Sequence, residues 1–517
     1  MRHVSLCING LAVVVAGLPW GFSACAGAEA ERGGAHFLRG AVERSDGTIE
    51  VRSWTPGEVV DGAVAPRMPE CRPVLQIPLE DRRSDAEQGV PPAGVAMQFS
   101  PDGSLLALGT IEGRVEVVRV PQGGVVASRQ LSEGAVKQVA FAADGKTLFV
   151  GEQSPDAFLY ALHPATLEER WTRRLADDIE ASTLPADDSM YGRFSLPGAY
   201  AVTPLADGGV VVAGAHGWTV DGVRRNRSRI WRLSGDGTLI AAFPAEGAAD
   251  AVFLFPSVSE SRAGGGDVGG DVLVGVSRSA SGPAPRDLPV GGLVDLDLAT
   301  LTPRWTRTFP ALSPWFTEVF FWEAVARGPD FSFAGLGDGR GYLLDDDGAP
   351  LLELQPGVPV LTAGIPVGVG VGYATVGAKG AWYLTTGTNI PWGSADPAAR
   401  PPAAHPAENT VHAVLPDGTP RWDRSVRYSV GGIVLSPDGS QLLVGAGPRD
   451  SDDRTDLFGA IVLSADTGDW ITTCSTAAPA DFRPVFAPDG GWIALAEAPY
   501  KAGDGTVAGA YQVTVFR

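Results

Sequence analysis

Positive charge is scarce in this chain of 517 residues. Only four residues are lysine, and the 60 acidic residues outnumber the 40 basic ones, so the net charge is −20. A field of this sign repels the phosphate backbone of nucleic acids and the headgroups of anionic lipids. The composition therefore argues against a nucleic-acid partner and against binding to a membrane surface through charge.

Long apolar runs are absent after the N-terminus, since no later stretch reaches the ~18 apolar residues that a membrane-spanning helix needs. The first apolar stretch, residues 6–18, follows Arg2 and His3 and is too short to cross a bilayer. A basic start, a short apolar segment and small residues are together typical of a signal peptide. We therefore predict that residues 1–24 are a signal peptide and that the chain is exported.

The segment Ser23-Ala24-Cys25 resembles the lipobox of bacterial lipoproteins, in which the cysteine receives the lipid. The resemblance implies lipidation of Cys25 and a protein anchored in the outer membrane. Phe22 departs from the pattern, because the family prefers leucine three positions before the cysteine. Ordinary cleavage after Ala26 or Ala28, which would release a periplasmic or extracellular protein, is the alternative.

Cysteine is scarce as well, with four residues in the whole chain. Cys7 lies in the predicted signal peptide, and Cys25 is either lipidated or removed with it. Export to an oxidising compartment favours a disulfide between the remaining pair, Cys71 and Cys474. Such a bond closes a loop of about 400 residues, which contributes on the order of 5 kcal/mol to stability through chain entropy. Two unrelated buried thiols are the alternative.

Motifs of catalytic or cofactor chemistry are missing. The six histidines are scattered, and the chain has no His-Glu-x-x-His or Cys-x-x-Cys zinc motif, no Gly-x-Ser-x-Gly motif and no phosphate-binding loop. The run Asp345-Asp346-Asp347-Gly348 suggests calcium, but a solvated hairpin turn explains it better. We therefore predict no catalytic residue and no cofactor, and we keep calcium as the weaker alternative.

Glycine and proline are abundant, with 67 and 41 residues, beside a hydrophobic fraction of 44%. These numbers disfavour long helices and favour many short strands joined by turns. Four segments end in Asp-Gly after an apolar residue, and each lies between two strand-like runs: residues 99–103, 141–145, 435–439 and 486–490. The first two segments are 42 residues apart and the last two are 51 apart, a period typical of β-propeller blades.

We therefore predict an all-β fold, a β-propeller of four-stranded blades over residues 71–517. Residues 25–70 precede it as an N-terminal arm or linker. The strand-like runs give eight blades. Seven is the alternative, because glycines blur the strands of the sixth blade.

The eighth blade is one strand short where the chain ends, and residues 74–79 supply the missing outer strand. Pro73 and Pro78 are tolerated there, because an outer strand does not need every N–H for pairing. This N-terminal strand closes the ring. It also places Cys71 beside the outer strand that contains Cys474.

A second repeat occurs in the predicted outer strands, where Arg-Trp-x-Arg recurs at residues 170–173, 304–307 and 421–424. We predict that each tryptophan packs between neighbouring blades with its indole N–H satisfied locally. With the preceding Tyr160-Ala161-Leu162 and Val411-His412-Ala413-Val414, these segments resemble quinoprotein-like (PQQ-like) propeller repeats. The Ser-Pro-Asp-Gly turns resemble WD-type repeats equally well. Dehydrogenases of the quinoprotein group use an adjacent pair of cysteines and calcium, and this chain has no such pair.

Loop lengths indicate which face of the propeller binds a partner. In a four-stranded blade, the second-to-third loops and the connections between blades share one face, and the other turns share the opposite face. Long loops on a rigid scaffold commonly bind ligands. The long insertions fall mostly on the first face, which we predict to be the binding face: residues 176–199, 215–229, 278–290, 388–409 and 446–457. Residues 264–270 are the exception, on the opposite face.

The candidate binding residues are the cationic, aromatic and acidic residues of these insertions: His216, Trp218, Arg224, Arg225, Arg227, Arg229, Trp392, His405, Arg449, Asp450, Asp452 and Asp453. A cluster of arginines can bind a carboxylate or a phosphate. The same arginines can instead pair with the three aspartates on another loop of that face. We favour this pairing.

These observations favour a monomeric, non-catalytic scaffold of the cell envelope that binds a protein or a glycan through its loop-rich face. The resemblance to quinoprotein-like repeats includes a non-catalytic outer-membrane assembly lipoprotein, which supports this class by analogy. The alternative is a metal-dependent hydrolase or lactonase with its site at the central channel. A divalent ion and acidic side chains that converge at the channel mouth would favour the enzyme.

Overall fold

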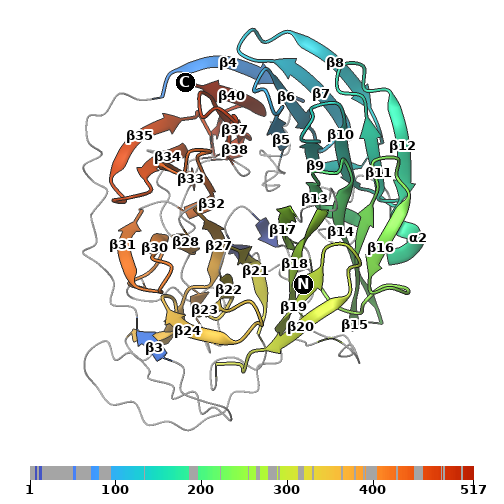
Figure 1. The fold of residues 1–517 in the computed structure, drawn as a ribbon. Coiled ribbons are helices and arrows are strands. Elements are labelled where there is room, and N and C mark those ends of the chain that lie inside the picture. The colour runs from blue at the N-terminus through green and yellow to red at the C-terminus, as the bar shows by residue number, and fades with distance from the viewer. Residues whose placement is uncertain are drawn as a thin grey trace.

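Short β-strands make up nearly all of the regular structure in the computed structural model, and α2 (Ala176–Ile179) is a single helical turn. Curled antiparallel sheets surround a central axis, so the fold is a β-propeller (Figure 1). No helix among the described residues is long and apolar enough to cross a membrane. The structure describes residues 6–8, 11–13, 50–53, 71–80, 95–132, 134–184, 196–221, 223–253, 255–262, 268–277, 288, 291–312, 319–328, 331–362, 365–377, 380–387, 390–391, 405–426, 429–447, 458–478, 480, 484–501 and 505–517.

The described strands form groups of four, each ordered from the centre of the ring outward. We refer to these groups as blades 1 to 8, and the number of blades in the complete chain stays a prediction. The first four are β5–β8 (Ala96–Phe99, Leu105–Gly109, Arg114–Arg119, Val125–Gln130), β9–β12 (Ala135–Phe141, Leu148–Gln153, Phe158–Leu162, Glu169–Arg174), β13–β16 (Gly198–Pro204, Val210–Val220, Val223–Leu233, Leu239–Phe243) and β17–β20 (Ser257–Arg262, Val268–Val276, Gly292–Asp297, Pro303–Thr308).

Blades 5 to 8 follow the same order, except that the last strand of blade 8 comes from the N-terminal side of the chain. They are β21–β24 (Phe321–Arg327, Ser332–Leu336, Gly341–Leu344, Pro350–Gln355), β27, β28, β30 and β31 (Val371–Val376, Trp382–Thr386, Thr410–Val414, Pro420–Ser425), β32–β35 (Ser429–Leu435, Gln441–Gly447, Gly459–Ser464, Trp470–Ser475) and β36, β37, β40 and β4 (Val485–Phe486, Ile493–Glu497, Gln512–Phe516, Pro73–Pro78).

Eight short strands lie outside these groups. β1 and β2 form a small hairpin, and β3 pairs with the outer strand of blade 5. The others form two small sheets within the connections of blades 5, 6 and 8. Their bounds are β1 (Leu6–Ile8), β2 (Leu11–Val13), β3 (Glu50–Ser53), β25 (Val360–Thr362), β26 (Ile365–Gly368), β29 (Ile390–Pro391), β38 (Tyr500–Lys501) and β39 (Val507–Ala508).

The repeated Asp-Gly segments are the turns between the first and second strands of their blades. In blade 1, Ser100 Oγ donates to Asp102 Oδ1 at 2.6 Å and accepts the N–H of Leu105 at 2.9 Å. Ser436, Asp438 and Gln441 repeat this geometry in blade 7. The glycine that follows each aspartate has a positive φ, which a residue without Cβ adopts without strain: Gly103, Gly145, Gly439 and Gly490.

The tryptophans of the Arg-Trp-x-Arg repeat join neighbouring blades, as predicted. Trp171, on the outer strand of blade 2, donates its indole N–H to the carbonyl of Gly235 at 2.9 Å, in a turn of blade 3. A Cβ at Gly237 of that turn would lie 2.7 Å from the indole ring, so only glycine fits. The same contact recurs for Trp305 with Asp346 and Gly348, and for Trp422 with Ala465 and Gly468.

The N-terminal strand closes the ring. β4 pairs antiparallel with β40 and thereby becomes the outer strand of blade 8, as predicted (Figure 1). Just before β4, the N–H of Cys71 donates to the carbonyl of Thr473 at 2.9 Å, and a disulfide joins Cys71 to Cys474 on β35. The closing strand is therefore bound to blade 8 by its ladder and to blade 7 by the disulfide.

Two inner strands differ from the sequence prediction. In blade 4 the inner strand is β17, whereas residues 251–255 were expected to form it. In blade 6 it is β27, whereas the segment near residues 360–371 folds mainly into the separate β25–β26 hairpin. Pro366 and the glycines around it interrupt that segment, because proline lacks an N–H and glycine weakens a strand.

Candidate binding face

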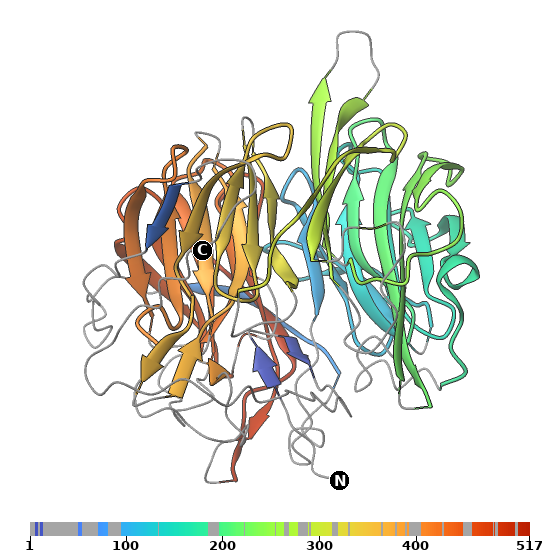
Figure 2. The same ribbon diagram turned by 90° about the horizontal axis from the view of Figure 1, so that it is seen from below.

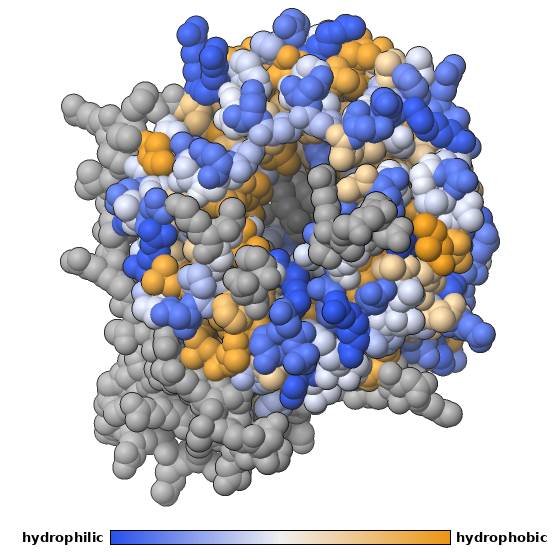
Figure 3. Space-filling view, viewed as in Figure 1, coloured by the Kyte–Doolittle hydropathy of each residue, from blue (hydrophilic) through white to orange (hydrophobic). Residues whose placement is uncertain are grey.

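The β14–β15 hairpin extends the second-to-third connection of blade 3 as a two-stranded ribbon. We call the face of these connections the loop face, and the opposite one the turn face. Figure 2 shows the β14–β15 hairpin projecting from one face and the β17–β18 hairpin from the other, which agrees with their places in the blades. The space-filling view shows a hollow at the centre of the ring (Figure 3).

Residues 215–229, which we predicted to be a loop, form most of this hairpin. Eleven residue pairs join β14 to β15, from Val210 with Leu233 to Val220 with Val223. Asp221 begins the connection with φ at 49°, the left-handed conformation that a two-residue Asp-Gly turn requires. The prediction was wrong because polar residues occupy both faces of the ribbon, so no apolar alternation marked it as strand.

The register divides the predicted arginine cluster. Residues directly opposite in an antiparallel pair share a face of the ribbon, and the faces alternate along each strand. One face therefore holds five of the candidate residues: His216 opposite Arg227, Trp218 opposite Arg225, and Arg229 opposite Gly214. Arg224 lies opposite Thr219, one position out of step with them.

The two arginines nearest the blade pair with carboxylates of the preceding blade connection. Arg229 lies 2.8 Å from Asp178 Oδ1 on α2 and donates to the carbonyl of Ala245 at 2.8 Å. Arg227 lies 3.5 Å from Glu180. The pairing that we predicted, with Asp450, Asp452 and Asp453, stays a prediction, because these aspartates lie outside the described residues. The two arginine side chains fix the root of the hairpin.

The tip of the hairpin, residues 218–225, presents a different set of side chains. Trp218 is half-buried and lies against His216 with ring centroids 4.6 Å apart. Arg225 is exposed, and Val220 and Val223 beside the turn are 42% and 38% exposed. Tryptophan and arginine are among the residue types enriched in protein-binding hot spots, and the two valines add exposed apolar surface beside them.

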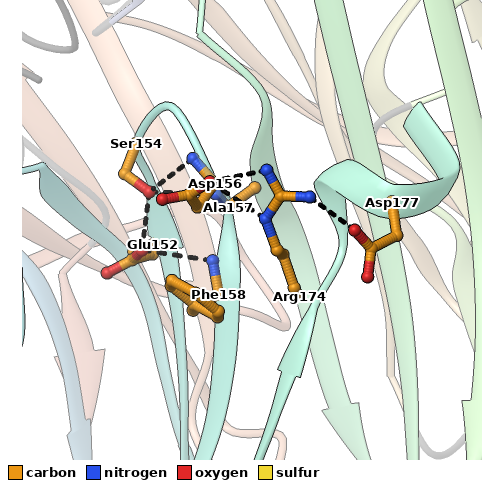
Figure 4. A network of polar contacts seen from close by, with 7 residues as sticks. All are labelled: Glu152, Ser154, Asp156, Ala157, Phe158, Arg174 and Asp177. Carbon is orange, nitrogen blue, oxygen red and sulfur yellow. Dashed lines mark hydrogen bonds and ion pairs between the residues drawn. The ribbon is translucent and has the colours of Figure 1, made fainter. Parts of the chain in front are cut away.

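The helix α2 holds the hairpin in place through Asp178. Besides Arg229, Asp178 accepts the indole N–H of Trp231 at 2.6 Å and lies 3.4 Å from Arg173. In Figure 4, Arg174 bridges Asp177 of the helix and Asp156 of the preceding loop, with Arg174 Nε donating to Asp156 Oδ1 at 2.9 Å. The hairpin root is therefore connected to blade 2 by charged side chains.

Glu152 organises the loop that contains Asp156. Its Oε1 accepts the hydroxyl of Ser154 at 2.6 Å and the N–H of Phe158 at 3.1 Å (Figure 4). The carboxyl is fully buried. Burial raises the pKa of Glu152 above its ordinary value of 4.5, although these hydrogen bonds oppose the shift.

Glu152→Gln is expected to make the free energy of unfolding less dependent on pH. It should keep the hydrogen bonds that hold the loop of Asp156. The raised pKa favours folding below pH 4.5, and this contribution is lost as the pH rises through the folded-state value. Glutamine keeps the acceptor oxygen and never ionises, so the variant should gain stability relative to the wild type as the pH rises from 4.5. Urea denaturation at several pH values measures this difference. Equal pH profiles for both proteins would contradict it.

Of the other predicted binding residues, His405 is described and is only 4% exposed. Its Nε2 contacts the carbonyl of Val358 at 2.9 Å, and its Nδ1 accepts the N–H of Ala407 at 3.0 Å. Backbone groups of blade 6 and of the chain before it thus contact both ring nitrogens of this buried side chain. The remaining candidates lie outside the described residues: Trp392, Arg449, Asp450, Asp452 and Asp453.

His405 should make the protein sensitive to acid. Burial lowers its pKa from 6.5 to about 4, so the unfolded chain binds a proton more readily between these values. Stability is therefore lost as the pH falls from 6.5 to 4, by about 3 kcal/mol for this group. His405→Asn should flatten this part of the stability profile in denaturation experiments. A slope as steep as that of the wild type would contradict the prediction.

The acidic and histidine side chains also bear on the calcium alternative. No group of three or more His, Cys, Asp and Glu residues in that part of the chain could hold a metal ion. Asp345, in the acidic turn, accepts the N–H groups of Asp347 and Ala349 at 3.0 Å and 2.7 Å. That geometry is the hairpin turn favoured by the sequence.

Several residues of the hairpin and its root were not singled out in the sequence. Val220 and Val223 were not singled out, although Val-Asp-Gly-Val is a hairpin pattern that marks them as the residues flanking the turn. Asp178 and Glu180 lie in the predicted insertion 176–199, but no sequence pattern indicates their pairing with β15.

No protein-family model and no curated protein matches the chain. Solved structures match it in fold. The quinohemoprotein alcohol dehydrogenase ADHIIG from Pseudomonas putida HK5 is 12% identical with a TM-score of 0.55, over 90% of this chain and 78% of that one. Sqt1 from Saccharomyces cerevisiae is 10% identical with a TM-score of 0.51, over 87% and 99%. BamB from Moraxella catarrhalis is 14% identical with a TM-score of 0.45, over 86% and 98%. The likeness to the first two of these structures agrees with the β-propeller fold described above and with the PQQ-like and WD-like repeats of the sequence.

Proposed function

We propose that this protein is a non-catalytic binding scaffold of the cell envelope, and that its loop face contacts a protein or a glycan. The observation on which this proposal mainly depends is the tip of the β14–β15 hairpin. It presents Trp218, Arg225, Val220 and Val223 beyond the blade. The N-terminal sequence supports export, with a signal peptide over residues 1–24 and lipid attachment at Cys25.

The hairpin is built to hold its tip in one conformation. Its root is fixed by Arg229 with Asp178 and by Arg227 with Glu180. A two-stranded ribbon alone is marginally stable in water, so these contacts support an element that the propeller core does not need. A rigid tip binds with a smaller loss of conformational entropy than a flexible loop. The arginine tip of a chain with net charge −20 also favours a partner with acidic groups.

Site-specific crosslinking in the native cells tests this function. A photo-crosslinking residue at Val223 should form a discrete adduct with one partner, whereas the same residue at Val125 should not. Val125 is 56% exposed on the outer strand of blade 1 and serves as the matched control. Adducts of equal yield from both positions would contradict a specific loop face.

Once the partner is purified, Trp218→Ala and Arg225→Ala should each weaken its binding about 30-fold, the effect of losing a hot-spot side chain. Neither side chain belongs to the propeller core, so the thermal unfolding midpoint should stay that of the wild type. Isothermal titration calorimetry and differential scanning calorimetry measure the two quantities. Undiminished affinity in the Trp218→Ala/Arg225→Ala double variant would overturn the proposal.

A further inference from the structure

The outer edge of blade 5 is paired with a segment from the N-terminal arm. β3 lies parallel to β24, with Glu50 opposite Leu352, Val51 opposite Glu353, Arg52 opposite Leu354 and Ser53 opposite Gln355. Figures 1 and 2 both show β3 along the outer side of this blade. β3 and β4 belong to the same arm of the chain, yet they add to different blades, 5 and 8.

The burial of β24 matches this pairing residue by residue. The four residues that pair with β3 are all buried, with exposed fractions from 0% to 9%, whereas Leu351 just before them is 45% exposed. The outer strands β12, β20 and β31 have no buried residue at all. β24 is therefore covered along the length of the parallel ladder and open before it.

The sequence of β24 explains why its edge accepts another strand. An exposed edge strand is normally protected from pairing by charged side chains. The outer strands β12, β20 and β31 each contain two or three arginines. β24 contains one charged residue, Glu353, which is fully buried and accepts the hydroxyl of Tyr342 and the amide N–H of Gln355. Its edge is thus free of exposed charge.

β16, the outer strand of blade 3, provides an internal comparison. Its sequence, Leu-Ile-Ala-Ala-Phe, has no charge either, and it ends its sheet without a further strand in the described part of the chain. Leu239 and Ile240 at its start are 40% and 49% exposed. The unpaired start of β16 is thus exposed, although its last two residues, Ala242 and Phe243, are buried without a further strand. In β24 the buried stretch is longer and covers all four residues of the ladder.

We propose that the edge of β24 is a docking site for an extended peptide strand, and that the chain's own Glu50–Ser53 occupies it in cis. Backbone hydrogen bonds supply affinity in this mode of recognition, so the ligand is an extended segment that pairs in parallel register. A four-residue parallel ladder is short, and the tether supplies an effective concentration in the millimolar range. The arm is thereby a strap that masks the site from other extended peptides.

Hydrogen exchange on the full-length protein tests the strap. Val51→Pro/Arg52→Pro removes two successive N–H groups from β3, so the outward-facing amides of β24 should exchange at least 10-fold faster. The matched control is Glu43→Pro/Arg44→Pro in the same arm, which should leave β24 at the wild-type rate. Unchanged protection of β24 in the Val51→Pro/Arg52→Pro protein would overturn the proposal.

A labelled peptide of residues 46–57 tests the site itself. It should bind the Val51→Pro/Arg52→Pro protein at least 10-fold more tightly than the wild type, whose own strand competes. A scrambled peptide is the control, and bound peptide should restore protection at β24 but not at β16. Equal binding to both proteins, or protection at β16, would overturn the site. A wild-type dimer that becomes monomeric in the proline variant would overturn docking in cis.

Discussion

Replacing Cys71 with alanine is expected to lower the free energy of unfolding by about 5 kcal/mol, because the disulfide restricts a very long loop in the unfolded chain. The two cysteines are 403 residues apart, so the bond links almost the whole propeller into one closed loop. In the folded protein it also connects the start of β4, which completes blade 8, to β35 of blade 7.

Equilibrium denaturation in urea, followed by tryptophan fluorescence, measures this loss. Four samples separate the loop effect from local packing: oxidised wild type, reduced wild type, Cys71→Ala and Cys71→Ala/Cys474→Ala. Cys71 is half-buried, whereas Cys474 is fully buried beside Val462 and Leu495, so the single variant disturbs the core least. Reduced wild type and Cys71→Ala should agree, and the double variant should be less stable than both because it also truncates the buried Cys474. A loss below about 1 kcal/mol in Cys71→Ala would contradict the closed-loop argument.

The sequence was informative about the fold where local chemistry determines the backbone. Asp102-Gly103 and Asp438-Gly439 form the expected turns, because the serine before each aspartate donates to it and glycine tolerates positive φ. The strand that closes the ring was predicted by counting the strand-like runs, because blade 8 lacked one strand. Proline in that strand agreed with an outer edge, and β4 occupies it.

The sequence was less informative about contacts between residues that are far apart in the chain. The arginines of β15 were recognised as a cluster, but their partners Asp178 and Glu180 are distant in sequence and belong to another blade connection. His405 looked like a surface histidine because it lies in a polar insertion. Only the fold brings the carbonyl of Val358, 47 residues away, to its Nε2.

The extended β14–β15 ribbon and the pairing of β3 with β24 were not predicted, for a related reason. In the β14–β15 ribbon several of the buried residues are polar, among them His216, Ser228 and Arg229, so no apolar alternation marks its strands and it resembles a loop in sequence. β3 is four residues long, and its location depends on the free edge of β24, not on its own sequence. Elements added to a completed propeller are therefore hard to predict, and these are the elements on which both proposals depend.

Arg340→Met is expected to destabilise the protein by about 3–5 kcal/mol, because it leaves a buried carboxylate without its partner. Arg340 and Asp338 are 0% and 2% exposed, and Arg340 Nη2 lies 2.6 Å from Asp338 Oδ2. Arg340 also donates to the hydroxyl of Tyr342 at 2.9 Å and to the carbonyl of Pro310 at 2.6 Å. It thereby ties the β22–β23 connection to the chain that enters blade 5.

The cost arises from the unpaired charge and not from the lost arginine itself. Burial opposes the charge of Arg340, but the attraction of Asp338 outweighs it and raises the arginine pKa above its ordinary value. A pair in this environment contributes little when both members are replaced, because each charge loses its hydration on burial. Removing one member keeps the desolvation cost of the other and cancels the attraction.

A double variant distinguishes the two contributions. Asp338→Asn/Arg340→Met removes both charges and keeps an amide oxygen that can accept the N–H at position 340, as Asp338 Oδ1 does at 3.2 Å. It should recover at least half of the stability lost in Arg340→Met, as measured by urea denaturation under identical conditions. Tyr342→Phe controls for the hydroxyl that joins Arg340 to Glu353. If the double variant is as unstable as the single one, the loss comes from packing around the β22–β23 connection and the buried-charge explanation is wrong.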